Sequence, residues 1–451
     1  MAVFSTVGAS SLEDRVSEYR LDNGLKLVVV EDHRAPVAIA QVWYRVGSSY
    51  ESGGITGVSH VLEHMMFLGT EKQAPNEYSR MVSSLGGSDN AFTGTDYTAY
   101  YAQIAVEHLD SVLSLEADRM RNARMDAGEF KRELEVVKEE RRLRVEDRPK
   151  SLTYEIFQAT AWRVSPYRQP VIGWMSDLDS LSIEDVRRWY RYWYAPNNAV
   201  VVVAGDVRPQ DVYALVEKHF GALKAETTPE VKPRREPPQL GEKRIRVKAP
   251  AELPYLLMGY KTPSRVTALQ GDKPWEPFAL TVLADVLDGG ESARIPQRLV
   301  RGSEVAGQAG ASYNAYSRLD TVFTLAGVPA QSHTVAELEA ALVGEVRHLR
   351  DALISEEELQ RVKTRVVASD VFGRDSISAQ ANRIGLLESI GLNRRELDAY
   401  LAGIQAVTPE QVRAVARKYL VADRLTVAVL DPQPLDTKKP QRRGFAPARR
   451  H

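Results

Sequence analysis

The chain contains no cysteine among its 451 residues. Disulfide bonds, thiol nucleophiles, iron–sulfur clusters and cysteine-ligated zinc are therefore excluded. No apolar run reaches the roughly 20 residues that a transmembrane helix requires. The 59 basic and 60 acidic residues nearly cancel. This balance gives no electrostatic reason to expect nucleic acid or an anionic membrane as a partner.

Histidine is also scarce, with 8 residues in the whole chain. A metal site in this protein must therefore use His, Asp and Glu as ligands. The N-terminal stretch MAVFSTVGASSLEDR lacks the basic start and the apolar segment of a secretory signal. This absence predicts a cytoplasmic protein, whereas removal of an earlier signal peptide would place it in the periplasm.

Length and composition indicate a soluble globular protein of two or three domains, with 43% hydrophobic and 26% charged residues. Residues 224–241 are rich in proline and charge, which is typical of a linker. This linker would separate a first domain, 1–223, from a second, 242–432. Residues 433–451 carry prolines and clustered basic residues, and we expect them to form a disordered basic tail.

The two predicted domains end alike. Residues 182–205 and 408–431 each begin with a Ser or Thr suited to an N-cap, continue as an amphipathic helix rich in arginine, and finish in an apolar strand. The two segments lie about half the chain apart, which indicates an internal duplication. The sequence therefore predicts an α+β fold with two homologous domains, each a mainly antiparallel sheet packed against helices.

The chemistry is concentrated in a helix predicted over residues 56–68, which contains His60, Glu63 and His64. Residues four positions apart lie on the same face of a helix, so the two imidazoles can bind one tetrahedral zinc ion. Glu63 would project beside the metal, where a carboxylate can accept a proton from a water that the metal activates. The alternative is a histidine pair that merely packs on an amphipathic helix.

A catalytic zinc ion needs a third protein ligand. A second helix, predicted over residues 126–146, places Glu133 and Glu140 seven positions apart on one face. Composition alone does not distinguish Glu140 from its acidic neighbours. The other charged residues of this helix indicate a solvated, salt-bridged surface: Arg132, Lys138, Arg141, Arg142, Arg144 and Glu146.

The His60–His64 pair, followed by Glu140 within VVKEER, resembles the pitrilysin or insulinase family of inverted-motif (HxxEH) zinc metallopeptidases. The likeness extends through LDNGLKLVVVED, GVSHVLEHMMFLGT, GGSDNAFTGTDYTAYY and YAPNNAVVVVAGDV, and it points to the bacterial branch related to mitochondrial processing peptidases. It implies one Zn2+ per chain, held by His60, His64 and Glu140, with Glu63 as the catalytic base. Glu133 would orient the site through a ligand.

The resemblance also implies where a peptide substrate binds. In the family, a matching stretch lies on an edge strand near the zinc, where an extended peptide can add through main-chain hydrogen bonds. The corresponding residues here are Asn90, Ala91, Phe92 and Thr93. Family architecture places the site in a closed chamber of four domains, and one chain supplies two of them. A dimer is therefore implied.

One departure from the family pattern concerns the second domain. Active members commonly carry an Arg and a Tyr there, seven positions apart, whereas this chain has Val300 and Gly307 at the matching positions. We therefore expect a zinc-dependent endopeptidase for peptides or unfolded segments that forms a heterodimer with a related subunit supplying the Arg–Tyr pair. A homodimer, a non-catalytic structural or peptide-binding subunit, and an unrelated zinc hydrolase are the alternatives.

Overall fold

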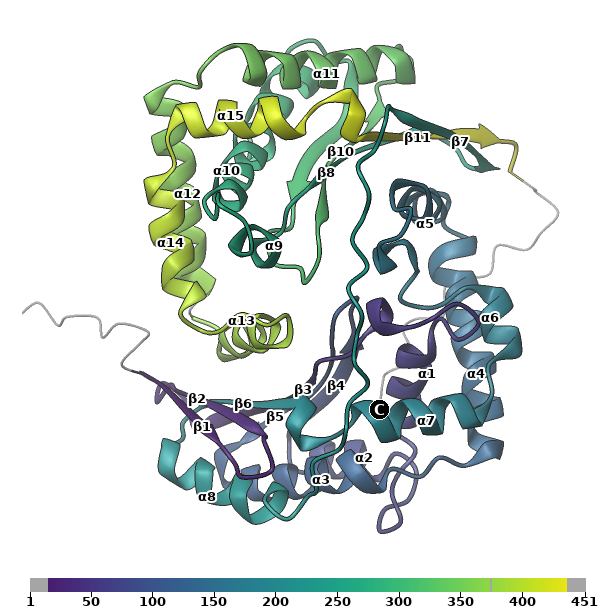
Figure 1. Cartoon of the computed structure of the whole chain (residues 1–451), viewed down its shortest axis with the longest axis vertical. Helices are drawn as coiled ribbons and strands as arrows, with labels where there is room; N and C mark the ends of the chain where they lie inside the picture. The colour runs from purple at the N-terminus through teal and green to yellow at the C-terminus, as the bar shows by residue number, and fades with distance from the viewer. Residues whose placement is uncertain (1–14, 374, 436–451) are drawn as a thin grey trace, which may run out of the picture.

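The computed structural model describes residues 15–373 and 375–435, which form two β-sheets surrounded by helices (Figure 1). The strands of the first sheet are β1 (Val16–Arg20), β2 (Lys26–Glu31), β3 (Val37–Tyr44), β4 (Ser88–Thr93), β5 (Thr98–Ala105) and β6 (Ala199–Gly205). Those of the second are β7 (Lys243–Pro250), β8 (Tyr255–Thr262), β9 (Ala306–Tyr313), β10 (Thr321–Pro329) and β11 (Leu425–Gln433). Most of the predicted basic tail, residues 436–451, lies outside the described part of the chain.

The two sheets share one topology. Their strand orders are β1-β2-β6-β3-β5-β4 and β7-β11-β8-β10-β9, so β1 is an addition to the first sheet. The pairs β2–β6 and β7–β11 are parallel, and the other neighbouring pairs in the described residues are antiparallel. The predicted α+β fold of two homologous, mainly antiparallel domains is confirmed. In both sheets the last strand in the order, β4 or β9, is an edge strand.

Helices cover both sheets. The helices of the first half are α1 (Val58–Met65), α2 (Glu77–Ser84), α3 (Leu109–Asn122), α4 (Ala127–Arg141), α5 (Pro149–Ala161), α6 (Met175–Ser180), α7 (Ile183–Trp193) and α8 (Pro209–Phe220). Those of the second half are α9 (Arg265–Leu269), α10 (Glu276–Asp288), α11 (Val335–Asp351), α12 (Glu356–Gly373), α13 (Ile377–Ser389), α14 (Glu396–Ala406) and α15 (Pro409–Tyr419). Within the described residues, none of these helices combines the length and apolarity needed to cross a membrane.

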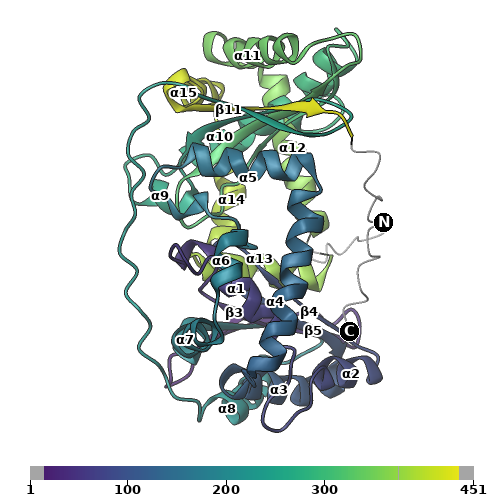
Figure 2. The same cartoon turned by 90° about the vertical axis from the view of Figure 1, so that its right-hand side faces the viewer.

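Each half of the chain lends one helix to the sheet of the other half. Helix α5 packs against β7, β8 and β11 of the second sheet, and α13 packs against β3 and β6 of the first (Figures 1 and 2). Phe157 of α5 is fully buried in a cluster with Leu257 and Ala428. Ile384 of α13 is fully buried in a cluster with Val202. This exchange joins the two domains through their cores.

The exchange also explains the continuous apolar run of β6. Successive side chains of a strand point to opposite faces, so a run of valines needs cover on both sides. Val201 and Val203 belong to the core formed with the helices of the first half. Val200 and Val202 belong to the cluster that includes residues of α13. The first sheet is therefore buried on both faces, although most of its strands are antiparallel.

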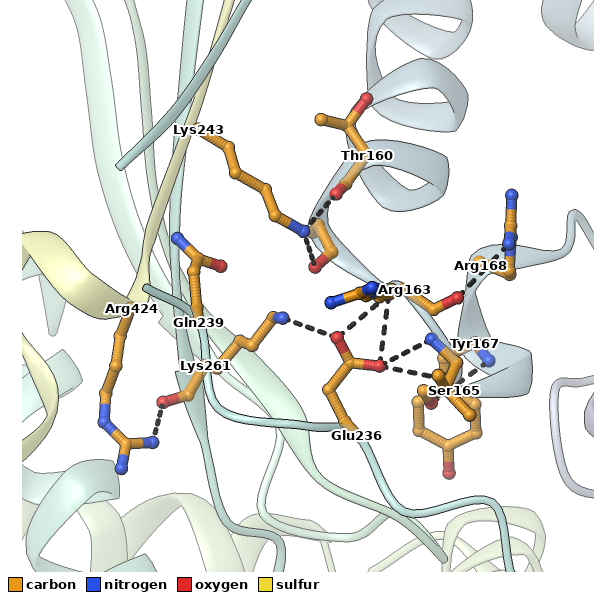
Figure 3. A network of polar contacts seen from close by, with 12 residues as sticks. Thr160, Arg163, Ser165, Tyr167, Arg168, Glu236, Gln239, Lys243, Lys261 and Arg424 are labelled. Atoms are coloured by element: carbon orange, nitrogen blue, oxygen red, sulfur yellow. Dashed lines mark hydrogen bonds and ion pairs between the residues drawn. The ribbon is translucent and has the colours of Figure 1, made fainter. Parts of the chain in front are cut away.

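The predicted linker forms no helix or strand between α8 and β7, yet it is anchored (Figure 3). The carboxylate of Glu236 accepts hydrogen bonds of 2.8 to 3.1 Å from the backbone N–H groups of residues 163–165. It also forms an ion pair of 2.7 Å with Lys261 of β8. Burial would raise the pKa of Glu236, but Lys261 and the backbone donors lower it to about 2. The linker is thus fixed at the junction between α5 and the second sheet.

Truncating the exchanged helix at its buried anchor should destabilise the whole chain. Phe157 is fully buried between α5 and the second sheet, so Phe157→Ala leaves a large cavity. We expect the free energy of unfolding to fall by about 3–5 kcal/mol, the usual cost of removing a buried phenylalanine. Urea unfolding followed by circular dichroism measures this loss. A change below about 1 kcal/mol would show that α5 is not an integral part of the second core.

Candidate metal centre

A buried acid holds the start of α1, the helix that carries the histidines. The carboxylate of Glu51 accepts hydrogen bonds from the backbone N–H groups of Gly57 at 2.7 Å and Ser59 at 2.9 Å. Complete burial raises the pKa of Glu51 to about 7. Gly57 has φ 88°, and a Cβ there would lie 2.7 Å from the carbonyl oxygen of Ile172. Helix α1 therefore begins after Gly57, later than the predicted residue 56. Glycine permits the left-handed backbone turn at Gly57 that precedes the helix.

Helices α1 and α4 bring the three predicted ligands together. Ligand atoms of His60, His64 and Glu140 lie within 4.8 Å of one another. Nε2 of His60 is 3.8 Å from one oxygen of Glu140, and Nε2 of His64 is 3.4 Å from the other. Two imidazoles and one carboxylate form the donor set of many catalytic zinc sites. The residues present therefore fit a zinc ion.

The electrostatics of this cluster also suit a divalent cation. Burial disfavours a charged His64, but hydrogen bonds to Glu133 and Glu140 outweigh it and raise the pKa of His64 to about 9. Burial would raise the pKa of Glu140, but His64, His60 and Arg144 lower it to about 2. The carboxyl group of Glu140 is thus ionised, and its negative charge stabilises a cation bound beside it. A metal that binds here must replace the proton on His64, so its affinity should fall as the pH decreases.

Glu133 lies behind His64, on the side away from Glu140. One oxygen of Glu133 is 3.1 Å from Nδ1 of His64, while Nε2 of the same ring faces Glu140. A carboxylate that accepts a hydrogen bond from Nδ1–H fixes the tautomer in which the Nε2 lone pair is available to a metal. This geometry supports the predicted orienting role of Glu133.

Removing the Glu133 carboxylate should weaken metal binding without abolishing it. We expect Glu133→Ala to lower zinc affinity by roughly 10–100-fold, the usual effect of losing a partner of a metal-ligating histidine. Competition with a chromogenic chelator measures the affinity. Glu135→Ala is the matched control, because Glu135 is an exposed residue of the same helix and pairs with Lys138. Equal affinities of the two variants would contradict the role of Glu133.

Glu63 lies beside the cluster, on the side of the edge strand β4. Its side chain is 3% exposed. One of its oxygens accepts a hydrogen bond of 2.6 Å from Oγ1 of Thr93, the last residue of β4. Thr93 thereby connects the predicted base to the strand predicted to bind the substrate. His60 and Glu63 both line a cavity of about 750 Å³.

The wall of this cavity includes three of the four predicted substrate-binding residues, namely Ala91, Phe92 and Thr93. Asn90 lies on the same strand but outside the wall described by the structure, and its side-chain oxygen accepts a hydrogen bond from the N–H of Ala91. The sequence reasoning missed further wall residues from α5, from the segment after it and from the second domain: Lys150, Tyr154, Tyr167, Arg168 and Tyr255. Their positions depend on tertiary contacts. Pro149 is the one local sequence signal for these positions. It predicts the start of helix α5, because proline favours the first turn of a helix.

Arg141 of helix α4 differs from the predicted solvated surface. Arg141 is buried, and its guanidinium forms two hydrogen bonds of 2.8 Å with the carboxylate of Glu155 in α5. The prediction that Arg141 is exposed was wrong, because this bidentate pair joins α4 to the exchanged helix. Arg144 lies in the π-helical turn after α4, pairs with Glu140 at 2.7 Å and lines the cavity.

The second domain has no donors at the two positions that depart from the family pattern. Val300 ends a π-helical segment and packs at the margin of the second core. Gly307 lies on β9, the edge strand that corresponds to β4. Among the described residues, His60, His64 and Glu140 form the only group of three or more metal-ligating side chains with their ligand atoms close together.

The chain is similar to known proteins over most of its length. A model of the family described as Insulinase (Peptidase family M16) matches residues 26–173, and a Peptidase M16 inactive domain model matches residues 180–366. The chain is 32% identical to Zinc protease PqqE of Helicobacter pylori, covering 83% of this chain and 84% of that protein. It is 27% identical to a probable mitochondrial-processing peptidase subunit beta of Arabidopsis thaliana, over 94% and 79% of the two chains. The crystal structure of a protease from Helicobacter pylori superimposes with a TM-score of 0.86 at 28% identity, covering 92% of this chain and 99% of that one.

Proposed function

The chain belongs to the insulinase family of peptidases, peptidase family M16, and from this premise we propose that it is a zinc-dependent endopeptidase of peptides or unfolded segments. The observation that carries this proposal is the cluster of His60, His64 and Glu140, with Glu63 next to it in a cavity of about 750 Å³. A purely structural subunit would be expected to have lost residues of the zinc-binding motif. In this chain every residue of the motif is present.

His60, His64 and Glu140 would hold the metal. When bound, zinc would supply Lewis acidity, which lowers the pKa of a water and polarises a carbonyl group. Glu63 accepts the proton of the attacking water and later donates a proton to the leaving amine. The hydroxyl of Thr93, 2.6 Å from Glu63, orients this carboxylate. The free edge of β4 positions the substrate by main-chain hydrogen bonds, which tolerate many side chains.

We further propose that the active form is a dimer, with this chain as the metal-carrying subunit. Val300 and Gly307 offer neither charge nor hydroxyl where an Arg–Tyr pair is expected. A related subunit that carries this pair would supply the missing donors to the oxyanion that forms during cleavage. A homodimer with another donor is the alternative assembly.

The second candidate is a non-catalytic subunit that binds peptides or supports another chain. The loss of the Arg–Tyr pair favours this candidate, and the match of residues 180–366 to an inactive-domain model leaves it open. Metal analysis and a cleavage assay separate the two. We expect stoichiometric zinc and cleavage of a quenched fluorescent peptide by the chain assembled with its partner, and loss of cleavage when a chelator removes the metal. Zinc-loaded assemblies that cleave no peptide would favour the non-catalytic role.

A further inference from the structure

Basic residues from three separate elements converge on the cavity beside Glu63. Arg144 comes from the π-helical turn after α4, Lys150 from the first turn of α5, and Arg168 from a short 3-10 helix after α5. We call these three residues the cationic wall. All three are exposed, so their charged ends are accessible to a molecule that enters the cavity.

In the described part of the chain, the acidic residues that line the cavity form no ion pair with Lys150 or Arg168. The carboxylate of Glu155 is engaged by Arg141 through two hydrogen bonds of 2.8 Å. Glu63 is buried, and its carboxylate accepts a hydrogen bond from the hydroxyl of Thr93. Among the described residues, Lys150 and Arg168 form no ion pair with a carboxylate. Glu140, the ion-pair partner of Arg144, is the third ligand of the proposed metal, which would itself neutralise that carboxylate.

Two of the three cations are held in place by their surroundings. The ammonium group of Lys150 lies 5.2 Å from the centre of the Tyr255 ring, a cation–π distance that keeps it at the junction of the two domains. Arg168 follows the segment whose backbone is fixed by Glu236, and its guanidinium donates to the carbonyl oxygen of Arg163 (Figure 3). Contacts at the junction of α5, the linker and the second sheet therefore fix the positions of Lys150 and Arg168.

From this arrangement we infer that the cavity selects peptides with an acidic side chain, Asp or Glu, close to the bond presented to Glu63. The inference rests on the proposed peptidase function and adds the chemistry of the substrate to it. A peptide carboxylate that enters the cavity meets Lys150 and Arg168, which form no ion pair with a carboxylate among the described residues, whereas a basic side chain meets charges of its own sign. The aromatic rings of Phe92, Tyr154 and Tyr255 line the same cavity and suit apolar residues beside the acid.

The test is a binding measurement that does not depend on cleavage. Two unstructured, rhodamine-labelled peptides of equal length differ only in a central pair of residues, Glu in one and Lys in the other. Fluorescence anisotropy gives their affinities for the zinc-loaded full chain carrying Glu63→Gln. At low ionic strength the Glu peptide should bind on the order of 10-fold more tightly, and this preference should shrink as salt is added.

Charge reversal tests the residues themselves. Introducing Lys150→Glu and Arg168→Glu together should abolish the preference or reverse it. The first substitution places an acid in the N-terminal turn of α5, where negative charge is favourable, so the fold should tolerate it. Lys131→Glu is the matched control, because Lys131 is an exposed residue of α4 outside the cavity wall. It makes the same charge change per residue and should leave the preference intact.

The outcomes separate this inference from the proposed function. Equal affinities of the two peptides, no binding of the Glu peptide, or an unchanged preference in the double variant would each overturn the cationic wall as a determinant of specificity. The proposed function fails by a different observation, namely that the zinc-loaded assembly with intact Glu63 cleaves neither these peptides nor any other.

Discussion

Replacing Glu63 by Gln is expected to leave metal binding intact and to reduce peptide cleavage by roughly 10²–10⁴-fold, the usual contribution of a general base. The amide has the size of the carboxylate and can still interact with the hydroxyl of Thr93, which lies 2.6 Å from Glu63. It cannot accept the proton of the attacking water. Zinc content by atomic emission and the initial rate on a quenched fluorescent peptide, both measured on the chain assembled with its partner, check this expectation.

His60→Ala is the contrasting variant at the same site. His60 supplies one of three ligand atoms that lie within 4.8 Å of one another, and two remaining ligands hold a divalent ion poorly. This variant should lose both the metal and the activity, whereas Glu63→Gln should lose only the activity. Near-normal turnover by zinc-loaded Glu63→Gln protein would remove Glu63 from the mechanism. Stoichiometric zinc at the same site in His60→Ala would overturn the ligand assignment.

The local part of this site was readable from the sequence, and the distant part was not. The spacing of His60 and His64 places both rings on one helix face whatever the rest of the fold does. Glu140 lies on another helix, and residue chemistry alone did not separate it from its acidic neighbours. Its assignment came from the family resemblance. The structure now brings it to 3.4 Å from His64, which supports that assignment on geometric grounds.

The wall of the cavity illustrates what sequence reasoning lacks. Lys150 and Tyr255 meet in space only because α5 packs against the second sheet. No local sequence pattern predicts such an exchange of helices. Arg141 was expected at the surface because it lies in a run of charges, but its partner Glu155 stands on the exchanged helix and both are buried. Tertiary contacts decide which members of a charged run face solvent.

The fold itself was predictable where the periodicity was strong. The valine run of β6 indicated a buried strand, and the similar ends of the two halves indicated a duplication, which the matching strand orders of the two sheets support. The same run did not reveal that α13 from the second half provides the cover on its other face. An apolar strand specifies that both of its faces are buried, but it does not specify the residues that bury them.

The isolated chain is expected to bind zinc yet to cleave peptides feebly. The tetrahedral oxyanion formed during cleavage needs donors besides the metal, and loss of one such donor costs about 10²–10³-fold in rate. Val300 and Gly307 cannot provide them, because one side chain is aliphatic and the other residue has none. Adding a related subunit that carries an Arg–Tyr pair at these positions should therefore raise the cleavage rate by roughly 10²–10³-fold without changing the zinc content of this chain.

Two further measurements make this expectation specific to the donor pair. Replacing the Arg and the Tyr of the added subunit should remove the gain in rate while the two subunits still co-elute in size-exclusion chromatography, because donors to the oxyanion are distinct from the contacts that hold an assembly together. Introducing Val300→Arg and Gly307→Tyr into this chain tests whether cleavage requires the donor pair, because the pair is then supplied by this chain and not by the added subunit. The heterodimer hypothesis is lost if this chain, shown by mass spectrometry to be free of any partner, already cleaves peptides as fast as the assembled pair.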